Sequence, residues 1–163
     1  MMTDVFIFAT DTVYGLGAAC DDCAAIDTLY RLKNRPASQP MQVLVADRGM
    51  AELLVHIDHT EPIDAQTRIY PARKNVSIDA RLIADEGLGV RMPDHRALQN
   101  YIYGLGVPIA ATSANLRGAP SIFQEDAVRK VFPDIPIVVT GDCGAGESSQ
   151  IWDMRYEIPK QLR

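Results

Sequence analysis

Cysteine, histidine and tryptophan are scarce in this chain, and positive charge is not in excess. The 163 residues include three cysteines, three histidines and one tryptophan. Because the cysteines are few and odd in number, we expect no disulfide scaffold at this length. The 16 lysines and arginines against 21 aspartates and glutamates give a net charge of −5. This balance argues against a surface built throughout for nucleic acid.

Long apolar runs are also lacking. No uninterrupted apolar stretch approaches the roughly 20 residues that a membrane-spanning helix needs. Met1–Val5 carry no basic segment and no cleavage-site pattern, so we expect no secretory signal, no membrane partner and a cytoplasmic location. The composition, 47% hydrophobic and 23% charged, is typical of a globular protein, and the length favours one domain over residues 1–163.

Short apolar runs alternate with stretches of helical periodicity along the chain. Strands are predicted at Asp4–Ala9, Met41–Ala46, Gly89–Met92, Pro108–Ala111, Pro136–Val139 and Gln150–Met154, with a further one around Val76–Ile78. Helices are predicted at Asp22–Lys33, Gly49–His56, Pro62–Tyr70, Arg96–Tyr103 and Gln124–Phe132. Asp21 or Asp22 is expected to cap the first of them, and Asp94 the fourth. This order favours an α/β layer fold with a mixed sheet.

Three segments that follow apolar strands are rich in threonine, serine, asparagine and glycine. They are Thr10–Gly17, Thr112–Ser121 and Asp142–Ser149, each predicted as a loop. Short hydroxyl and amide side chains at strand ends can fix a small polar ligand, and glycine lets backbone N–H groups approach it. The same residues are ordinary turn formers. The pattern is therefore consistent with ligand-binding loops and with plain turns.

Three cationic residues stand at the ends of predicted elements. Lys33 and Arg35 follow a helix, and Arg91 lies in a short strand between apolar neighbours. Arginine offers a planar fork for carboxylate or phosphate, whereas lysine offers a point charge. Lys33 and Arg35 equally fit a simple role at the negative end of the helix dipole. Arg91 either faces solvent or has a partner.

Familiar nucleotide, hydrolase and zinc motifs are missing or incomplete. The chain has no Walker A loop, no G-x-G-x-x-G after a strand and no G-x-S-x-G elbow. Cys20 and Cys23 form a C-x-x-C pair, and His56 and His59 are separated by two residues. Zinc sites usually space their histidines by three to five residues. We therefore expect no bound zinc, with the cysteines in a core or at a helix start and the histidines on the surface.

Five segments, in order along nearly the whole chain, carry distinctive motifs. They are Thr10–Gly17 (TDTVYGLG), Lys33–Pro36 (KNRP, with Pro40), Val90–His95 (VRMPDH), Pro108–Asn115 (PIAATSAN) and Ser149–Asp153 (SQIWD). Together they resemble the YrdC-like family, the threonylcarbamoyl-AMP synthases of tRNA modification. The resemblance implies a single-domain YrdC-like α/β fold, in which a twisted mixed sheet and flanking helices surround a large concave cavity. It also implies the short form of the family, without a C-terminal domain.

The resemblance further implies a reaction and a set of site residues. The family joins L-threonine, bicarbonate and ATP into threonylcarbamoyl-AMP and pyrophosphate, and a t6A transferase complex moves the group to position 37 of tRNA. By motif position, Thr12, Arg91, Ser113 and Ser149 contact L-threonine, while Lys33, Arg35, Asn115 and Arg163 contact ATP. Mg²⁺ is expected to accompany the nucleotide. No residue is expected to act as acid, base or nucleophile, and Lys33 and Arg35 are expected to clamp the leaving pyrophosphate.

The chain departs from the family pattern at several positions. It begins at the first strand, the W-P-G-P-x-T segment reads Tyr70–Asn75, Gln150 replaces a threonine, and Leu44 stands where some members have histidine. Transferred geometry is therefore least secure over residues 69–88. The alternatives are an RNA-binding YrdC-like protein and a degenerate or regulatory paralogue. A carbamoyl-transfer domain of hydrogenase maturation is disfavoured, because the acylphosphatase and zinc-finger segments fused to it are not seen in this sequence.

Overall fold

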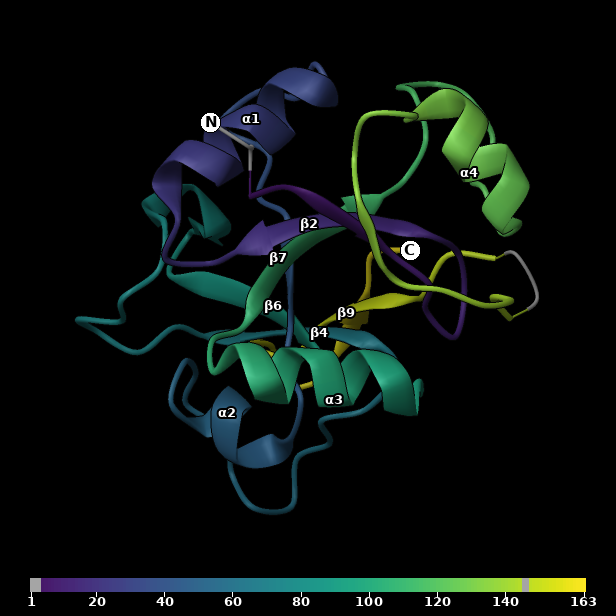
Figure 1. Ribbon diagram of the computed structural model, residues 1–163. Coiled ribbons are helices and arrows are strands. Elements are labelled where there is room, and N and C mark those ends of the chain that lie inside the picture. The colour runs from purple at the N-terminus through teal and green to yellow at the C-terminus, as the bar shows by residue number, and fades with distance from the viewer. Residues whose placement is uncertain (1–3, 145–146) are drawn as a thin grey trace.

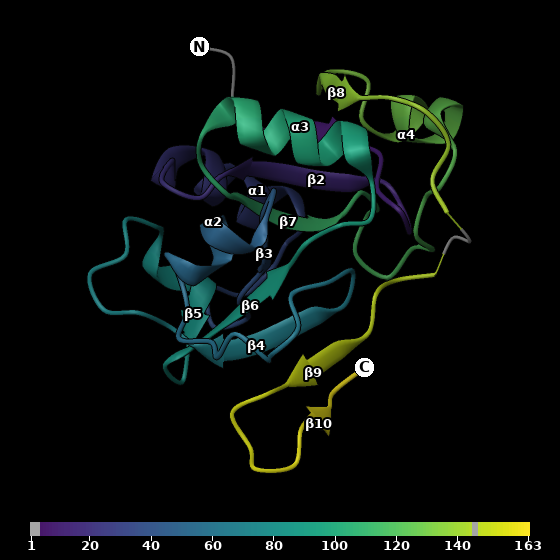
Figure 2. The ribbon, with the colours of Figure 1, turned by 90° about the horizontal axis from the view of Figure 1, so that it is seen from below.

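One mixed sheet organises the computed structural model, which describes residues 4–144 and 147–163. Its ten strands within these residues are β1 (Phe6–Phe8), β2 (Gly15–Ala19), β3 (Gln42–Leu44), β4 (Thr67–Pro71), β5 (Ile83–Ala84), β6 (Gly87–Arg91), β7 (Ile109–Ser113), β8 (Ile137–Val139), β9 (Ile151–Asp153) and β10 (Lys160–Gln161). Nine follow the order β10-β9-β4-β6-β3-β7-β2-β1-β8, and β5 pairs with β6. Figure 2 shows this order from β10 at the bottom to β8 at the top. Parallel and antiparallel pairs occur together, which confirms the predicted mixed α/β sheet.

Helices lie on both sides of the sheet. In the described residues they are α1 (Cys23–Leu32), α2 (Arg48–Glu52), α3 (Arg96–Leu105) and α4 (Glu125–Val131), with a 3₁₀ turn at Ala80–Leu82. In Figure 1, α1 and α4 lie above the strands, and α2 and α3 lie below them. No helix among the described residues is long and apolar enough to cross a membrane.

The ends of two long helices follow from their capping residues. Asp22 caps α1 as predicted, because its carboxylate accepts the Ala25 N–H at 2.9 Å. His95, and not Asp94, caps α3 through an Nδ1 that accepts the Leu98 N–H. That helix also continues past the predicted end at Gly104. It stops at Leu105, because Gly106 takes the left-handed conformation (φ 76°) that ends helices.

Three predictions from the sequence are wrong in their secondary structure. Residues 62–70 do not form a helix, because Thr67–Pro71 is strand β4, which pairs with both β6 and β9. Its β-branched and aromatic residues favour that conformation. Residues 76–78 are not a strand but part of a loop, which the Asp79 N–H fastens to the Cys20 carbonyl. The third wrong prediction is that the segments from Thr10 and from Thr112 are loops throughout, since β2 begins at Gly15 and β7 continues to Ser113.

The core lies between the sheet and the helices that cover it. Ile26 and Leu29 of α1, and Leu98 and Ile102 of α3, are fully buried. Strand β2 approaches β1 so closely that a Cβ on either of its glycines would clash with the Phe8 ring. This close approach explains the glycines of the segment GLG. It also holds the polar residues before β2 against the end of the sheet.

Candidate functional site

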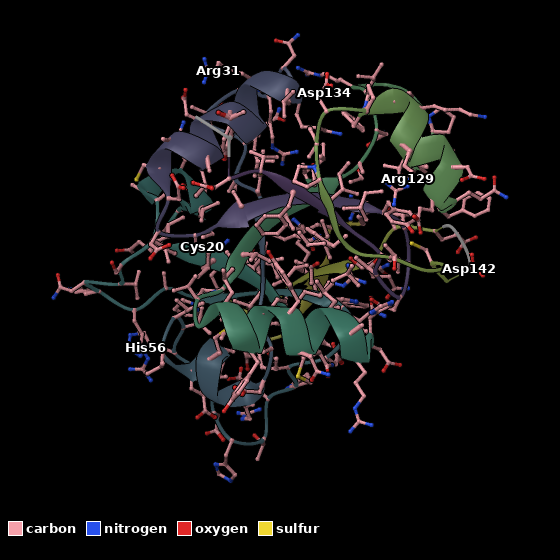
Figure 3. The ribbon with its side chains drawn as sticks, in the orientation of Figure 1. Cys20, Arg31, His56, Arg129, Asp134 and Asp142 are labelled. Carbon is pink, nitrogen blue, oxygen red and sulfur yellow. The ribbon has the colours of Figure 1, made fainter. Side chains whose placement is uncertain are left out.

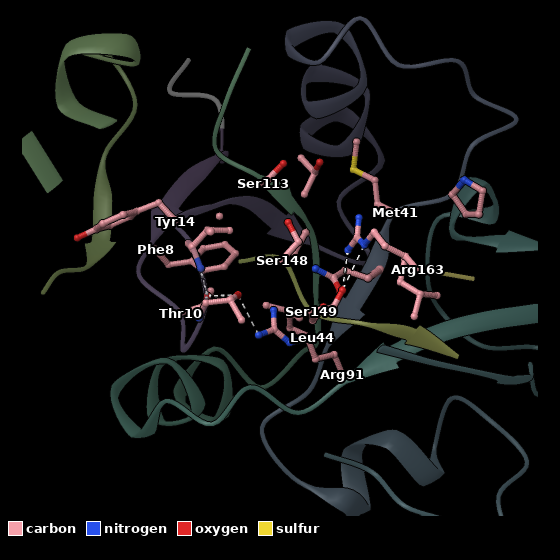
Figure 4. Close-up of a pocket in the computed structure, with 18 of the residues that line it drawn as sticks. Phe8, Thr10, Tyr14, Met41, Leu44, Arg91, Ser113, Ser148, Ser149 and Arg163 are labelled. Atoms are coloured by element: carbon pink, nitrogen blue, oxygen red, sulfur yellow. Dashed lines mark hydrogen bonds between the residues drawn. The ribbon is translucent and has the colours of Figure 1, made fainter. Parts of the chain in front are cut away.

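A first cavity of about 170 Å³ opens beside the ends of β3, β6 and β7 (Figure 4). Residues from the segment before β2, from the segment before β3 and from the segment before β9 complete its lining. Of the residues predicted from the sequence, Thr12, Arg35, Arg91, Ser113, Ser149 and Arg163 line it. A second cavity of about 180 Å³ is lined by Lys33, Arg35, Ser113, Asn115 and Arg117, among others. Arg35 and Ser113 belong to both linings, so the two cavities adjoin. The structure thus brings all eight predicted residues to one region, and no described residue of 69–88 lines either cavity.

Arg91 is held rigidly at the end of β6. The residue is 3% exposed, its Nε donates to the Ala65 carbonyl at 2.8 Å, and its Nη2 donates to Asp11 at 2.7 Å and to Thr12 Oγ1 at 3.2 Å. No described residue accepts a hydrogen bond from Nη1. Every fully buried side-chain nitrogen or oxygen among the described residues has a partner, so Nη1 is at the cavity surface. Burial lowers the pKa of this guanidinium and Asp11 opposes the shift, so the group stays charged.

Lys33 organises the loop that follows β7. The side chain is buried, and its Nζ donates to the carbonyl oxygens of Ser113 (2.9 Å) and Asn115 (2.6 Å) and to Asn115 Oδ1 (2.9 Å). Ser113 Oγ donates to the same Oδ1. Burial and the charge of Arg35 lower the pKa of Lys33 to about 8. The ammonium therefore positions Ser113 and Asn115 as well as adding positive charge beside the cavity.

The three residues Lys33, Asn34 and Arg35 form the turn that ends α1. The Arg35 N–H donates to the Tyr30 carbonyl at 2.9 Å, and the Asn34 N–H donates to the Arg31 carbonyl at 3.0 Å. These are the two hydrogen bonds of a Schellman motif. Asn34 has φ 44°, a left-handed conformation that asparagine tolerates better than most residues. The turn aims Lys33 at the β7 loop and Arg35 at the shared wall of the two cavities.

Among the described residues, four of the five cations that line the cavities have no carboxylate partner, whereas Arg91 is paired with Asp11. Arg48, Arg68, Arg81, Arg129 and Arg155 each form an ion pair with an acidic side chain. Within the part of the chain that the structure describes, no ion pair includes Lys33, Arg35, Arg117 or Arg163.

Among the described residues, only carbonyl oxygens accept hydrogen bonds from Arg35. It donates to those of Gln39 (2.8 Å) and Pro40 (2.7 Å). Burial, with the charges of Arg117 and Arg163, lowers its pKa. Gathered guanidiniums without anions are unfavourable, so this region is suited to an anionic ligand.

The C-terminal residues reach the cavity through the β9–β10 pair. The Ile151 N–H donates to the Arg163 carbonyl, and the Leu162 N–H donates to the Ile151 carbonyl. The Arg163 guanidinium donates to the Ser149 carbonyl at 3.1 and 3.2 Å, which Figure 4 shows as dashed lines. Arg163 is therefore fastened beside Ser149 and is not a loose tail.

A second anchor holds the segment that leads to Ser149. Tyr14, which lines the first cavity, donates its hydroxyl to the Gly141 carbonyl, and the Gly141 N–H donates to Glu125 of α4. Burial and the charge of Glu125 raise the pKa of Tyr14 to about 12. Gly144 lies so close to the Asp11 carbonyl that a Cβ would overlap it. The cavity wall thus depends on close backbone packing.

The cysteines and histidines do not assemble. Cys20 is buried, Cys23 is exposed, and His56 lies on the surface in the loop after α2 (Figure 3). No group of three or more His, Cys, Asp or Glu residues among those described is arranged to hold a metal ion. The absence of zinc remains a prediction, and the residues present give no basis for a resident metal.

Several residues at the site were not singled out from the sequence. Asp11 pairs with Arg91, and Arg117 lines the second cavity. Thr67 contacts Ser149, and Gln42 accepts a hydrogen bond from Thr67. Arg117 follows Asn115 by two residues, so its charge next to a predicted ATP contact was a usable signal. Thr67 and Gln42 gave none, because their contacts join segments far apart in the sequence.

Comparisons with known proteins relate this chain to one family. The model of the Sua5/YciO/YrdC family, described as Telomere recombination, matches residues 3–163. The threonylcarbamoyl-AMP synthase of Bacillus subtilis is 33% identical over 98% of this chain and 49% of its own length. That of Dichelobacter nodosus is 33% identical over 88% of this chain and 79% of its own length.

Solved structures share the fold. Pyrococcus abyssi Sua5 in complex with L-threonine has a TM-score of 0.88 and 28% identity, over 99% of this chain and 50% of that one. Escherichia coli YciO has a TM-score of 0.85 at 20% identity, over 99% of this chain and 82% of that one, which shows the fold alone. The chain spans about half the length of the B. subtilis and P. abyssi proteins. With matching motifs, sequence and fold, the chain belongs to the Sua5/YciO/YrdC family.

Proposed function

We propose that the protein is an L-threonylcarbamoyladenylate synthase, a nucleotidyltransferase that forms threonylcarbamoyl-AMP and pyrophosphate from L-threonine, bicarbonate and ATP. The observation that carries this proposal is the meeting of Thr12, Arg91, Ser113 and Ser149 with cations that lack carboxylate partners. Relatives named for this activity support it. The product would pass to a t6A transferase complex for modification of tRNA.

The amino acid would bind in the first cavity, which Arg91 and Ser149 line. Arg91 offers Nη1 to the carboxylate, while its other nitrogens are fixed by Ala65, Asp11 and Thr12. A charge-assisted contact from a rigid, buried guanidinium gives both affinity and orientation. The hydroxyls of Ser113 and Ser149 provide the polar contacts for the amine. A complex of P. abyssi Sua5 with L-threonine supports this placement.

ATP would bind across the wall that the two cavities share. Its phosphates would lie near Arg35, with Lys33 behind them and Arg117 and Arg163 on either side. Mg²⁺ would enter as part of the MgATP substrate, with phosphate oxygens and water as its ligands, because no acidic cluster is available among the described residues. These cations would also stabilise the negative charge that grows on the leaving pyrophosphate.

The reaction needs no covalent bond to the protein. The threonine amine and bicarbonate form a carbamate with loss of water, as an N–C bond forms and a C–O bond breaks. A carbamate oxygen then attacks the α-phosphorus of ATP, and pyrophosphate leaves with the electron pair of the broken P–O bond. The residues at the site would align these groups, exclude water and balance charge.

A substitution at the shared wall tests this assignment. Arg35→Ala is expected to weaken ATP binding by about 10- to 100-fold, the effect of losing one charge-assisted contact, and to leave L-threonine binding nearly unchanged. Arg96→Ala is the matched control, because it removes the same charge from an exposed position on α3. Calorimetry with each ligand would measure both. Equal losses for ATP and L-threonine would show that Arg35 holds the whole site, which would contradict its assignment to the nucleotide.

A further inference from the structure

The proton of the Ser113 hydroxyl is already engaged inside the protein. Ser113 Oγ donates to Asn115 Oδ1 at 2.5 Å. The orientation of that amide is fixed, because its Nδ2 donates to the Ala119 carbonyl and its Oδ1 accepts from Lys33. The three protons of the Lys33 ammonium are matched by three other oxygens, so none is left for Ser113 Oγ. Toward the cavity, Ser113 Oγ therefore offers lone pairs only.

The proton of the Ser149 hydroxyl is engaged in the same way. Thr67 Oγ1 donates to Gln42 Oε1 at 2.5 Å. A hydroxyl has one proton, so in the 3.2 Å contact between Thr67 Oγ1 and Ser149 Oγ the donor is Ser149. Thr67 and Ser149 are 3% and 7% exposed, which leaves little room for water to replace this contact. Ser149 also faces the cavity as an acceptor.

We infer that Ser113 and Ser149 meet the amine of the amino-acid substrate as hydrogen-bond acceptors only, and that Thr67, together with Gln42, is the positioning residue that imposes this polarity on Ser149. The inference rests on the proposed function and names how the same cavity recognises its substrate. Both serines line the first cavity, as does Gln42, while Thr67 lies behind Ser149.

This polarity suits the reacting form of the amine. A neutral amine has two N–H bonds and one lone pair, and the lone pair must form the new N–C bond of the carbamate. Two acceptor oxygens can hold the two N–H bonds and leave the lone pair free. A serine whose proton pointed into the cavity would instead donate to that lone pair and make the amine a poorer nucleophile. The structure prevents this by giving each serine proton another acceptor, Asn115 Oδ1 for Ser113 and Thr67 Oγ1 for Ser149.

Two substitutions would reverse the polarity at Ser149, and one would preserve it. Thr67→Val keeps the shape of the side chain but removes the acceptor for the Ser149 proton. Gln42→Leu releases the Thr67 proton, which can then donate to Ser149. Thr67→Ser keeps the hydroxyl and is the matched control. The readouts are L-threonine binding by calorimetry, the steady-state kinetics of pyrophosphate release and thermal stability.

Thr67→Val and Gln42→Leu are each expected to lower kcat by about tenfold, the effect of one mismatched hydrogen bond, with the KM for ATP unchanged. Thr67→Ser is expected to keep kcat within about twofold. The double variant is expected to be no slower than either single variant, because both act through the same hydrogen bond. Losses that add, or a Thr67→Ser variant as slow as Thr67→Val, would overturn the inference alone. A wild-type protein that binds no L-threonine would refute the proposed function and, with it, this inference.

Discussion

Asn34 offers a sharp test of how the fold positions the cations, because its backbone is left-handed (φ 44°) and its neighbours are Lys33 and Arg35. A β-branched side chain in this conformation meets its own backbone, which costs roughly 1–2 kcal/mol. Asn34→Val should therefore lower the free energy of unfolding by about this amount, and Tm by about 2–4 °C for each kcal/mol in a domain of this size. Glycine adopts the conformation freely, so Asn34→Gly should lower stability by less than about 1 kcal/mol.

Asn34→Val should also weaken the binding of ATP at the candidate site. The Asn34 carbonyl accepts a hydrogen bond from Arg117. The two backbone hydrogen bonds of the turn fix the positions from which the side chains of Lys33 and Arg35 extend. Relaxing the turn should raise the KM for ATP by about tenfold or more, because small displacements of binding groups are costly. The KM for L-threonine should change little, since Arg91 and Ser149 come from other elements.

Asn75→Val is the matched control. Asn75 has φ 61°, and it lies in a loop that lines neither of the two cavities. The Asn75→Val variant should lose a similar amount of stability and keep the wild-type KM for ATP. Urea denaturation and the rate of pyrophosphate release would supply both quantities. If Asn34→Val loses stability with an unchanged KM for ATP, or if Asn34→Gly behaves like Asn34→Val, the turn does not position the cations.

Three further outcomes are expected. Arg117→Ala should weaken pyrophosphate binding by about tenfold in calorimetry, because Arg117 lines the second cavity and has no carboxylate partner among the described residues. Arg96→Ala should leave this affinity unchanged, and equal affinities of the two variants would show that Arg117 does not contribute to the site. At pH 8, where Lys33 (pKa about 8) is partly neutral, a bound polyphosphate should favour its ammonium form, so ATP binding should take up protons. Enthalpies measured in buffers of different ionisation heat would detect this uptake, and a Lys33→Arg variant that still shows it would assign the proton elsewhere. Gly144→Ala should raise the KM for L-threonine, because the added methyl group displaces the Asp11 loop beside Arg91; an unchanged KM would show that this packing does not support the site.

The sequence was sufficient where a property depends on neighbouring residues. The Asp22 cap and the 3.6-residue spacing of buried side chains predicted α1 to within a residue. The alternation of apolar strands and helices predicted the mixed sheet. The motifs predicted eight residues that the fold brings to two adjoining cavities. Their individual roles stay predictions until ligand binding is measured.

The sequence was insufficient where a property depends on distant pairing. Asp11 meets Arg91 across 80 residues, and Thr67 meets Ser149 across 82. Residues 62–70 were predicted to be a helix, yet pairing with β6 and β9 makes Thr67–Pro71 a strand. The direction of a hydrogen bond between two hydroxyls depends on their other partners, which only the fold supplies. For this reason the polarity of Ser149 could not be predicted.

The most direct test of the proposed function is to follow all three substrates into one product. The purified protein would be incubated with MgATP, L-threonine and ¹³C-bicarbonate, and the nucleotides analysed by mass spectrometry. We expect an AMP adduct that contains threonine and the ¹³C label, formed together with pyrophosphate, and no adduct when L-threonine is omitted. Pyrophosphate release that is independent of L-threonine, or an adduct without the label, would contradict the proposed reaction.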